Sequence, residues 1–156
     1  MANWTARLAE LGIALPVVAA PVAAYVPAVQ HGDLVYTSGQ LPFVDGRLEV
    51  LGKVSDGAQG LVHQDDAKAA ARQCALNALA AVDALVGIDA IDRIVKVTGF
   101  VASAPGFSGQ PQVINGASEL LGEIFGDAGL HARAAVGVAE LPLGAPVEVE
   151  LIVAVR

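Results

Sequence analysis

The sequence is poor in charged residues and contains no basic run. Only 16% of its 156 residues are charged, against about 25% in an ordinary globular domain. Such a deficit predicts that another copy of the protein covers part of the surface. The net charge is −7, and nucleic-acid binding needs a cationic surface, so we expect no nucleic-acid partner.

Cysteine and the common cofactor motifs are almost absent as well. Cys74 is the only cysteine, which excludes an internal disulfide and fits a reducing, cytoplasmic compartment. We expect it to be a small buried hydrophobic residue. The three histidines lack metal-ligand spacing, and neither a GxGxxG loop nor a GxSxG motif occurs. The sequence therefore predicts a protein without a metal or a cofactor.

An uncharged stretch over residues 11–30 has the composition of a membrane span or a signal peptide. Its three prolines would break a spanning helix, and the acidic residue just before it does not suit a signal sequence. We expect extended chain there and no membrane partner. The length fits one domain over residues 20–156, preceded by an N-terminal extension over residues 1–19 that packs on it.

The spacing of apolar residues predicts both helices and strands. Helices are expected over 3–10, 65–86 and about 108–125, where apolar residues recur at the helical period. Strands are expected in a hairpin of 26–29 and 34–38, weakly over 47–51, and over 91–102, 132–140 and 146–155, with extended chain over 13–24 and a loop over 52–60. This order predicts an α+β domain whose mixed sheet has two helices on one face.

The two C-terminal strands carry the most informative pattern. In the last strand, valine and leucine alternate with Glu148, Glu150, Ile152 and Ala154. Two helices can cover only one face of the sheet, so we expect the face with the glutamates to meet another subunit. The turn over 141–146 suggests that the two strands are antiparallel neighbours.

Arg133 stands alone among small apolar residues at the start of the strand over 132–140. Burying a guanidinium is costly unless an anion meets it, so we expect a buried arginine that binds an acid. Two interpretations stay open. One is a structural ion pair with Glu148 or Glu150. The other is a small-ligand site in which the arginine binds a carboxylate and a glutamate activates water.

Several short segments also occur in an order and spacing that together are specific. They are Ala20-Pro21 with Tyr25-Val26, the run Tyr36-Thr37-Ser38-Gly39-Gln40-Leu41-Pro42, residues 95–101, Ile114-Asn115, Ala132-Arg133, Leu141-Pro142 and residues 147–150. Through these segments the chain resembles the reactive intermediate deaminase family, RidA or YjgF, from about residue 20 to residue 155. The resemblance implies a homotrimer, similar in fold to the small trimeric chorismate mutases, with clefts between subunits. It also implies hydrolysis of reactive enamine or imine acids to 2-oxo acids and ammonia without a cofactor.

The resemblance assigns roles to individual residues. Arg133 matches the arginine that holds the substrate carboxylate, Glu148 matches the acid proposed to act on water, and Tyr25 matches a tyrosine of the cleft. The other matches to substrate-binding positions are Ser38, Gly39 and Asn115. Taken without the resemblance, Tyr25 and Asn115 are also compatible with ordinary hydrogen-bonded groups, and Ser38 is compatible with a strand terminator.

The chain departs from the family pattern at three places. Ala135 stands where a cysteine is common, His131 stands where a proline is common, and the chain is longer before residue 20 and between residues 43 and 65. A trimer that senses a carboxylic metabolite without turning it over is the alternative function. An endoribonuclease, a label that some relatives carry, is disfavoured by the acidic composition, and chorismate mutase activity would rest on fold analogy alone.

Overall fold

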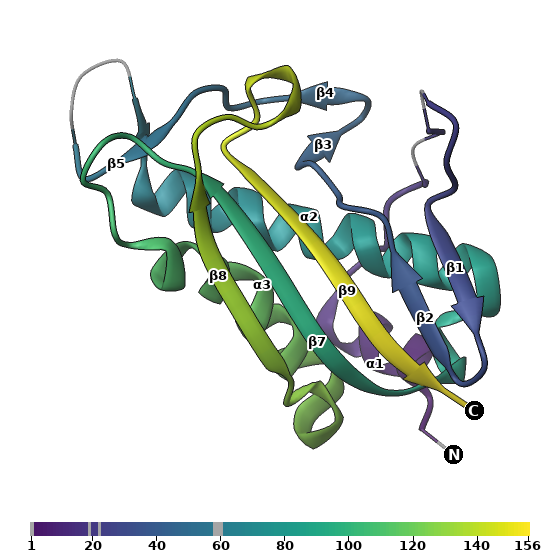
Figure 1. The fold of residues 1–156 in the computed structure, drawn as a ribbon. Helices are drawn as coiled ribbons and strands as arrows, with labels where there is room; N and C mark the ends of the chain where they lie inside the picture. Colours follow the sequence, from purple (N-terminus) through teal and green to yellow (C-terminus); the bar gives the residue numbers. More distant parts are fainter. Residues whose placement is uncertain (1, 19, 22, 58–60) are drawn as a thin grey trace.

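A mixed five-stranded sheet backed by two long helices forms the centre of the molecule (Figure 1). The computed structural model describes residues 2–18, 20–21, 23–57 and 61–156. The strands of the sheet are β1 (Ala28–His31), β2 (Leu34–Thr37), β7 (Ile91–Ala102), β8 (Ala132–Val138) and β9 (Val147–Val155). Their order is β1-β2-β9-β7-β8, and only the β7–β8 pair is parallel. The predicted α+β fold with a mixed sheet is confirmed.

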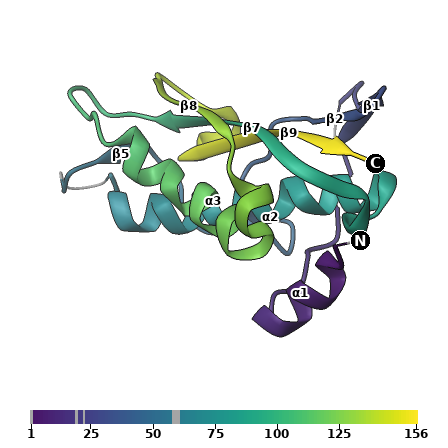
Figure 2. The same ribbon diagram turned by 90° about the horizontal axis from the view of Figure 1, so that it is seen from below.

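Helices α2 (Gln64–Val86) and α3 (Gln110–Phe125) form one layer against the sheet, as Figure 2 shows from a second direction. The buried residues of α3 keep the helical period predicted from the sequence: Val113, Ile114, Ala117, Leu120, Leu121, Ile124 and Phe125. A Cβ at Gly116 would collide with the backbone carbonyl of Lys68, so this glycine allows α2 and α3 to pack closely. By length and composition α2 could cross a membrane, but half of its apolar window is buried within the fold.

The position of β7 corrects one prediction. The two C-terminal strands are not neighbours, because β7 lies between them and pairs with both. Residues 139–146, which include the 3-10 turn η3 (Pro142–Gly144), cross over the end of β7 (Figure 1). The physical reason is the apolar composition of β7 on both of its faces, which favours a central position.

Shorter elements complete the domain. They are β3 (Phe43–Val44), β4 (Arg47–Leu48), β5 (Val54–Ser55), β6 (Val62–His63), η1 (Ile88–Ala90) and η2 (Gly126–Gly129). Asp45 and Gly46 both have positive φ and join β3 to β4 in a tight hairpin. The loop predicted over 52–60 contains β5, which pairs with β6, while residues 58–60 lie outside the described part of the chain.

The N-terminal helix α1 (Trp4–Leu11) packs against the outer end of α3 (Figure 2). Asn3 caps it, close to the predicted start. The Trp4 ring meets Phe125 edge to face at 4.8 Å between centroids, and its Nε1 donates a hydrogen bond of 2.8 Å to the carbonyl of Ile91. The chain that follows contains residues 19 and 22, which lie outside the described residues, so the predicted extended segment is only partly described.

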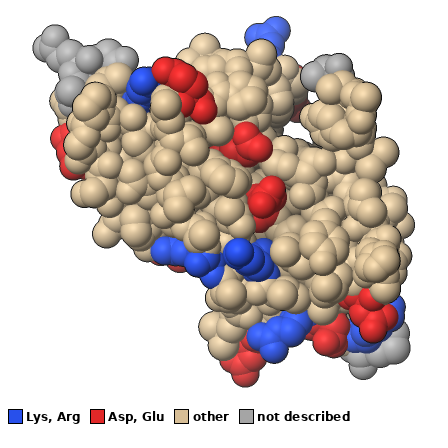
Figure 3. Space-filling model, in the orientation of Figure 1, with Lys and Arg blue, Asp and Glu red and all other residues tan. Residues whose placement is uncertain are grey.

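The second face of the sheet is left open by the described part of the chain. In β9 the buried residues alternate with the half-buried Glu148, Glu150, Ile152 and Ala154, as the sequence pattern predicts. Side chains on the same face include Val29, Tyr36 and Val136, which are 52%, 42% and 43% exposed. Figure 3 shows this face as mostly uncharged surface with acidic groups near its middle. An apolar open face of this kind is typical of a subunit interface.

Candidate functional site

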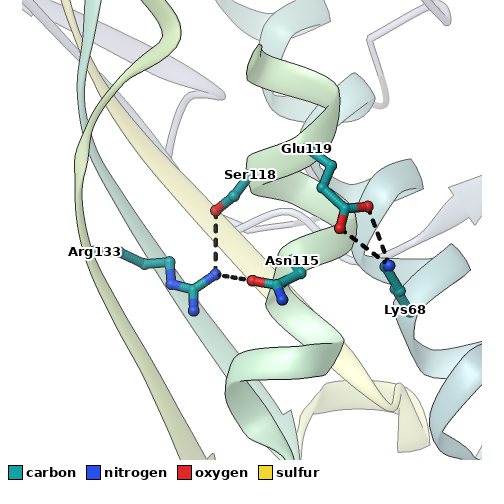
Figure 4. A network of polar contacts seen from close by, with 5 residues as sticks. All are labelled: Lys68, Asn115, Ser118, Glu119 and Arg133. Atoms are coloured by element: carbon teal, nitrogen blue, oxygen red, sulfur yellow. Dashed lines mark hydrogen bonds and ion pairs between the residues drawn. The ribbon is translucent and has the colours of Figure 1, made fainter. Parts of the chain in front are cut away.

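Arg133 extends from β8 toward α3, where two polar side chains meet it (Figure 4). Its Nη1 donates hydrogen bonds to Asn115 Oδ1 at 2.7 Å and to Ser118 Oγ at 3.3 Å. The residue is in register with the fully buried Val97 of β7, so its side chain leaves the sheet on the helix side. We call Asn115, Ser118 and Arg133 the arginine group.

The prediction that Arg133 is buried is wrong for the single chain. The residue is exposed, because β8 is an edge strand of the sheet in the described part of the chain. The structural ion pair is likewise wrong for the single chain, since no carboxylate among the described residues pairs with Arg133. The guanidinium is therefore held from one side and free to meet an external anion.

Two nitrogens of the Arg133 guanidinium, Nε and Nη2, are not used by Asn115 or Ser118. A guanidinium has five N–H donors, and the two on Nη1 are directed to Asn115 and Ser118. No acceptor within the described ranges meets Nε or Nη2. These two nitrogens form the parallel donor pair that binds a carboxylate in a bidentate manner.

Glu148 lies on the open face of the sheet, against the backbone of Gly39. A Cβ at Gly39 would collide with Oε1 of Glu148, so only glycine lets the carboxylate lie there. The segment is fixed on both sides: the Thr37 hydroxyl accepts from the Leu151 amide at 2.9 Å, and Gln40 exchanges two backbone hydrogen bonds with Val149. Between these points lie Ser38 and Gly39, and the Glu148 side chain reaches the backbone of Gly39.

The environment of Glu148 favours its protonated form. Burial raises the pKa of the Glu148 carboxyl, and the nearby Glu150 carboxylate raises it further by repulsion. No hydrogen-bond donor in the described part of the molecule meets the Glu148 carboxylate. A carboxyl group with a raised pKa is suited to exchange protons closer to neutral pH than an ordinary glutamate.

Ser38 and Tyr25 lie at the same end of β1 and β2. The Ser38 hydroxyl donates a hydrogen bond of 2.6 Å to the carbonyl of Val26, and its amide donates to Pro27. Ser38 thus ties down the strand end, which agrees with the strand-terminator interpretation and also holds Gly39 over Glu148. Tyr25 precedes Val26 and is half exposed. We call Ser38, Gly39 and Glu148 the glutamate group.

The structure brings the predicted residues together in two groups but separates the groups from each other. Arg133 is in register with Val97, which faces the helices, whereas Glu148 is in register with Phe100, which faces the open side. Within one chain the sheet therefore stands between them. A ligand cannot contact both groups of the same chain.

Two hollows on the surface belong to neither group. A shallow groove of about 400 Å³ lies between α2 and α3 and is lined by Lys68, Arg72 and Glu119 among others. A second hollow of about 360 Å³ lies between residues 16–18 and the β3–β4 hairpin. Because neither is lined by any residue of the arginine or glutamate group, we place no part of the site there.

Sequence reasoning missed Ser118 and the role of His131. The Ser118 hydroxyl lies 2.9 Å from His131 Nε2, and His131 Nδ1 lies 2.6 Å from the carbonyl of Gly129. The available signal was the spacing of Asn115 and Ser118, three residues apart on one helix and therefore on one face. His131 was noted only as a departure from proline.

Cys74 lies in the core of the domain. Cys74 is fully buried, as expected, and burial raises the pKa of its thiol well above the ordinary value. Such a thiol is unreactive. Among the described residues, no group of three or more histidine, cysteine, aspartate or glutamate side chains could hold a metal ion.

The protein is thus an α+β domain with two separate polar groups. One contains Arg133, whose Nε and Nη2 are available to an anion, and the other contains the partly buried Glu148. The chain belongs to the RidA/YjgF family: the sequence profile described as Endoribonuclease L-PSP matches residues 17–155. This confirms the resemblance found in the sequence.

Individual relatives cover nearly the whole chain. Protein TCP17 of Trypanosoma cruzi is 43% identical over 95% of this chain and 91% of its own length. A 2-iminobutanoate/2-iminopropanoate deaminase of Dermatophagoides farinae is 34% identical, covering 92% of this chain and 95% of that protein.

Solved structures agree with the fold. The Agrobacterium tumefaciens protein Atu1372, described as of unknown function, is 44% identical with a TM-score of 0.86, covering 98% of this chain and 92% of that chain. TdcF from E. coli, solved with bound serine, is 26% identical with a TM-score of 0.59, covering 90% of this chain and 98% of that chain.

Proposed function

We propose that this protein hydrolyses reactive enamine or imine acids to 2-oxo acids and ammonia without a cofactor. The observation that carries the proposal is the Arg133 guanidinium, which Asn115 holds through Nη1 while no acceptor among the described residues meets its Nε and Nη2. Membership of the RidA/YjgF family and a relative named as a 2-iminobutanoate/2-iminopropanoate deaminase support it.

Arg133 has the role of holding the substrate carboxylate. Its Nε and Nη2 donate two parallel hydrogen bonds to the two carboxylate oxygens, which fixes the plane of the conjugated imine. An imine carbon is already electrophilic, so holding it beside a water molecule supplies much of the rate. This accounts for a site with few functional groups.

Glu148 has the role of moving the proton. Its carboxylate takes a proton from water as the water oxygen bonds to the imine carbon, and it returns that proton to the imine nitrogen to give a carbinolamine. Glu148 then carries the proton of the carbinolamine hydroxyl to the nitrogen, so that the carbon–nitrogen bond breaks, ammonia leaves, and the carbon–oxygen double bond of the 2-oxo acid forms. Tyr25, which is half exposed and precedes the Val26 that accepts from Ser38, is assigned to steady the nitrogen.

A complete site requires two copies of the chain. Since the arginine and glutamate groups lie on opposite faces of the sheet, the substrate would contact Arg133 of one protomer and Glu148 of its neighbour. We propose a homotrimer built through the open sheet face, with one cleft at each contact between protomers. The apolar character of that face and the low content of charged residues support this assembly.

A carboxylate sensor is the second candidate, favoured by the same arginine and by Ala135, which leaves no thiol beside it. A sensor would bind a small acid without releasing ammonia. Ribonuclease activity, which the family description mentions, is opposed by the net charge of −7.

The test is ammonia release from 2-iminopropanoate generated in situ. The wild-type protein should accelerate it, and Arg133→Ala should lower kcat/KM by about 100-fold or more, because two charge-assisted hydrogen bonds are lost. Arg133→Lys is the matched control for charge, and it should recover only part of the activity because it lacks the fork. Full activity of Arg133→Ala would refute the proposal, and binding without ammonia release would favour the sensor.

A further inference from the structure

The hydrogen bonds behind Arg133 form a continuous chain with a single direction. The Gly129 carbonyl can only accept, so His131 Nδ1, 2.6 Å away, must donate to it. In the neutral imidazole Nε2 is then the acceptor, and the Ser118 hydroxyl, 2.9 Å away, must donate its proton there.

This direction determines what Ser118 offers to Arg133. With its only proton given to His131, the Ser118 oxygen presents lone pairs to Arg133 Nη1 at 3.3 Å. Asn115 Oδ1 accepts from the same nitrogen at 2.7 Å. Both protons of Nη1 are thus taken, and the guanidinium can neither rotate nor present a different edge without losing one of these bonds.

We propose that Ser118 and His131 are positioning residues that hold the Arg133 guanidinium so that its Nε–Nη2 edge receives the substrate carboxylate. This inference rests on the proposed function, because it assumes that Arg133 binds a carboxylate. An exposed arginine on an edge strand would otherwise sample many rotamers, and binding would have to freeze them. Ser118 and His131 order the Arg133 side chain in advance, so that binding no longer has to supply this free energy.

Glu119, which follows Ser118 on α3, provides a matched control for the Ser118 variants (Figure 4). Asn115 and Ser118 point from α3 to Arg133, whereas the next residue, Glu119, points to Lys68 on α2 and pairs with it at 3.1 Å. Glu119→Gln alters an exposed polar side chain of α3 without touching the arginine group.

The first measurement is the dissociation constant of pyruvate, a small 2-oxo acid, by calorimetry, together with KM and kcat for 2-iminopropanoate. Ser118→Ala should raise the dissociation constant and KM by about tenfold, the cost of ordering one long side chain, with kcat nearly unchanged. Ser118→Thr keeps the hydroxyl and should retain wild-type values, as should Glu119→Gln.

The second pair of variants tests His131. His131→Leu removes the acceptor of the Ser118 proton and should weaken pyruvate binding by about threefold, while His131→Gln, whose amide oxygen can replace Nε2, should restore it. The His131 side chain is partly exposed and lies outside the core cluster. The His131 variants therefore test the positioning role even where a Ser118 variant folds poorly.

The outcomes separate this inference from the proposed function. Wild-type protein that neither binds pyruvate nor releases ammonia would refute both. Wild-type protein that binds pyruvate, with Ser118→Ala equally tight or with Ser118→Thr as weak as Ser118→Ala, would overturn the positioning role and leave the proposed function standing.

Discussion

Arg133 and Glu148 lie on opposite faces of one sheet, with β7 between the strands that carry them. If one site takes the arginine from one protomer and the glutamate from the next, two inactive variants can complement each other. Arg133→Ala and Glu148→Gln, each inactive alone, should recover about one quarter of wild-type activity when unfolded together and refolded as an equal mixture. Activity no higher than that of either variant alone would contradict a shared site.

The acidic limb of the pH profile is expected to depend on Glu150. Burial and the Glu150 carboxylate both raise the pKa of Glu148. Glu148 acts as a base only when deprotonated, so activity should fall as pH drops through this raised pKa. Glu150→Gln removes the repulsion and should move the acidic limb of kcat/KM to lower pH, whereas the same change at the exposed Glu140 should leave it in place.

Gly39 is the residue whose size matters most for the glutamate group. In Gly39→Ala the new Cβ would displace the Glu148 carboxylate, and misplacement of a reacting group by about 1 Å can cost about 100-fold in rate. We expect kcat to fall by that order, with a small loss of stability because a flexible side chain can move aside. Gly122→Ala, where nothing lies within 4 Å of the new Cβ, is the control and should stay active.

Trp4 anchors α1 to the domain through one hydrogen bond and one ring contact. Trp4→Phe keeps the ring but loses the hydrogen bond to Ile91, and should lower the free energy of unfolding by about 1 kcal/mol. Trp4→Ala loses both and should cost about 3 kcal/mol. Urea unfolding measures both values, and ammonia release should be unaffected because α1 contributes no residue to either group. Equal stability of all three proteins would show that α1 is not docked in solution.

The local pattern of the sequence predicted most elements well. The helices at Gln64–Val86 and Gln110–Phe125 and the alternation along Val147–Val155 follow directly from the periods of their apolar residues. Strand order did not follow, because the period of a strand says which residues share a face but not which strand lies beside it. A short connection suggested a hairpin, and the apolar composition of β7 outweighed it.

Individual side chains of the site were harder to place. Arg133 was expected to be buried because its sequence neighbours are small and apolar, yet exposure is decided by its place on an edge strand. The sequence does not indicate a role for Ser118, because a single serine within a helix forms no recognisable motif. Its partner His131 becomes meaningful only once the fold brings residues 118 and 131 within hydrogen-bond distance.

The place of β9 has a consequence for synthesis of the chain on the ribosome. This strand, over Val147–Val155, inserts between β2 and β7, which are made much earlier. Until β9 leaves the exit tunnel, the edges of β2 and β7 that it pairs with stay unpaired, and α2 lacks the apolar residues of β9 against which it packs. The core of the nascent protein therefore stays incomplete until β9 has been made and has paired with β2 and β7.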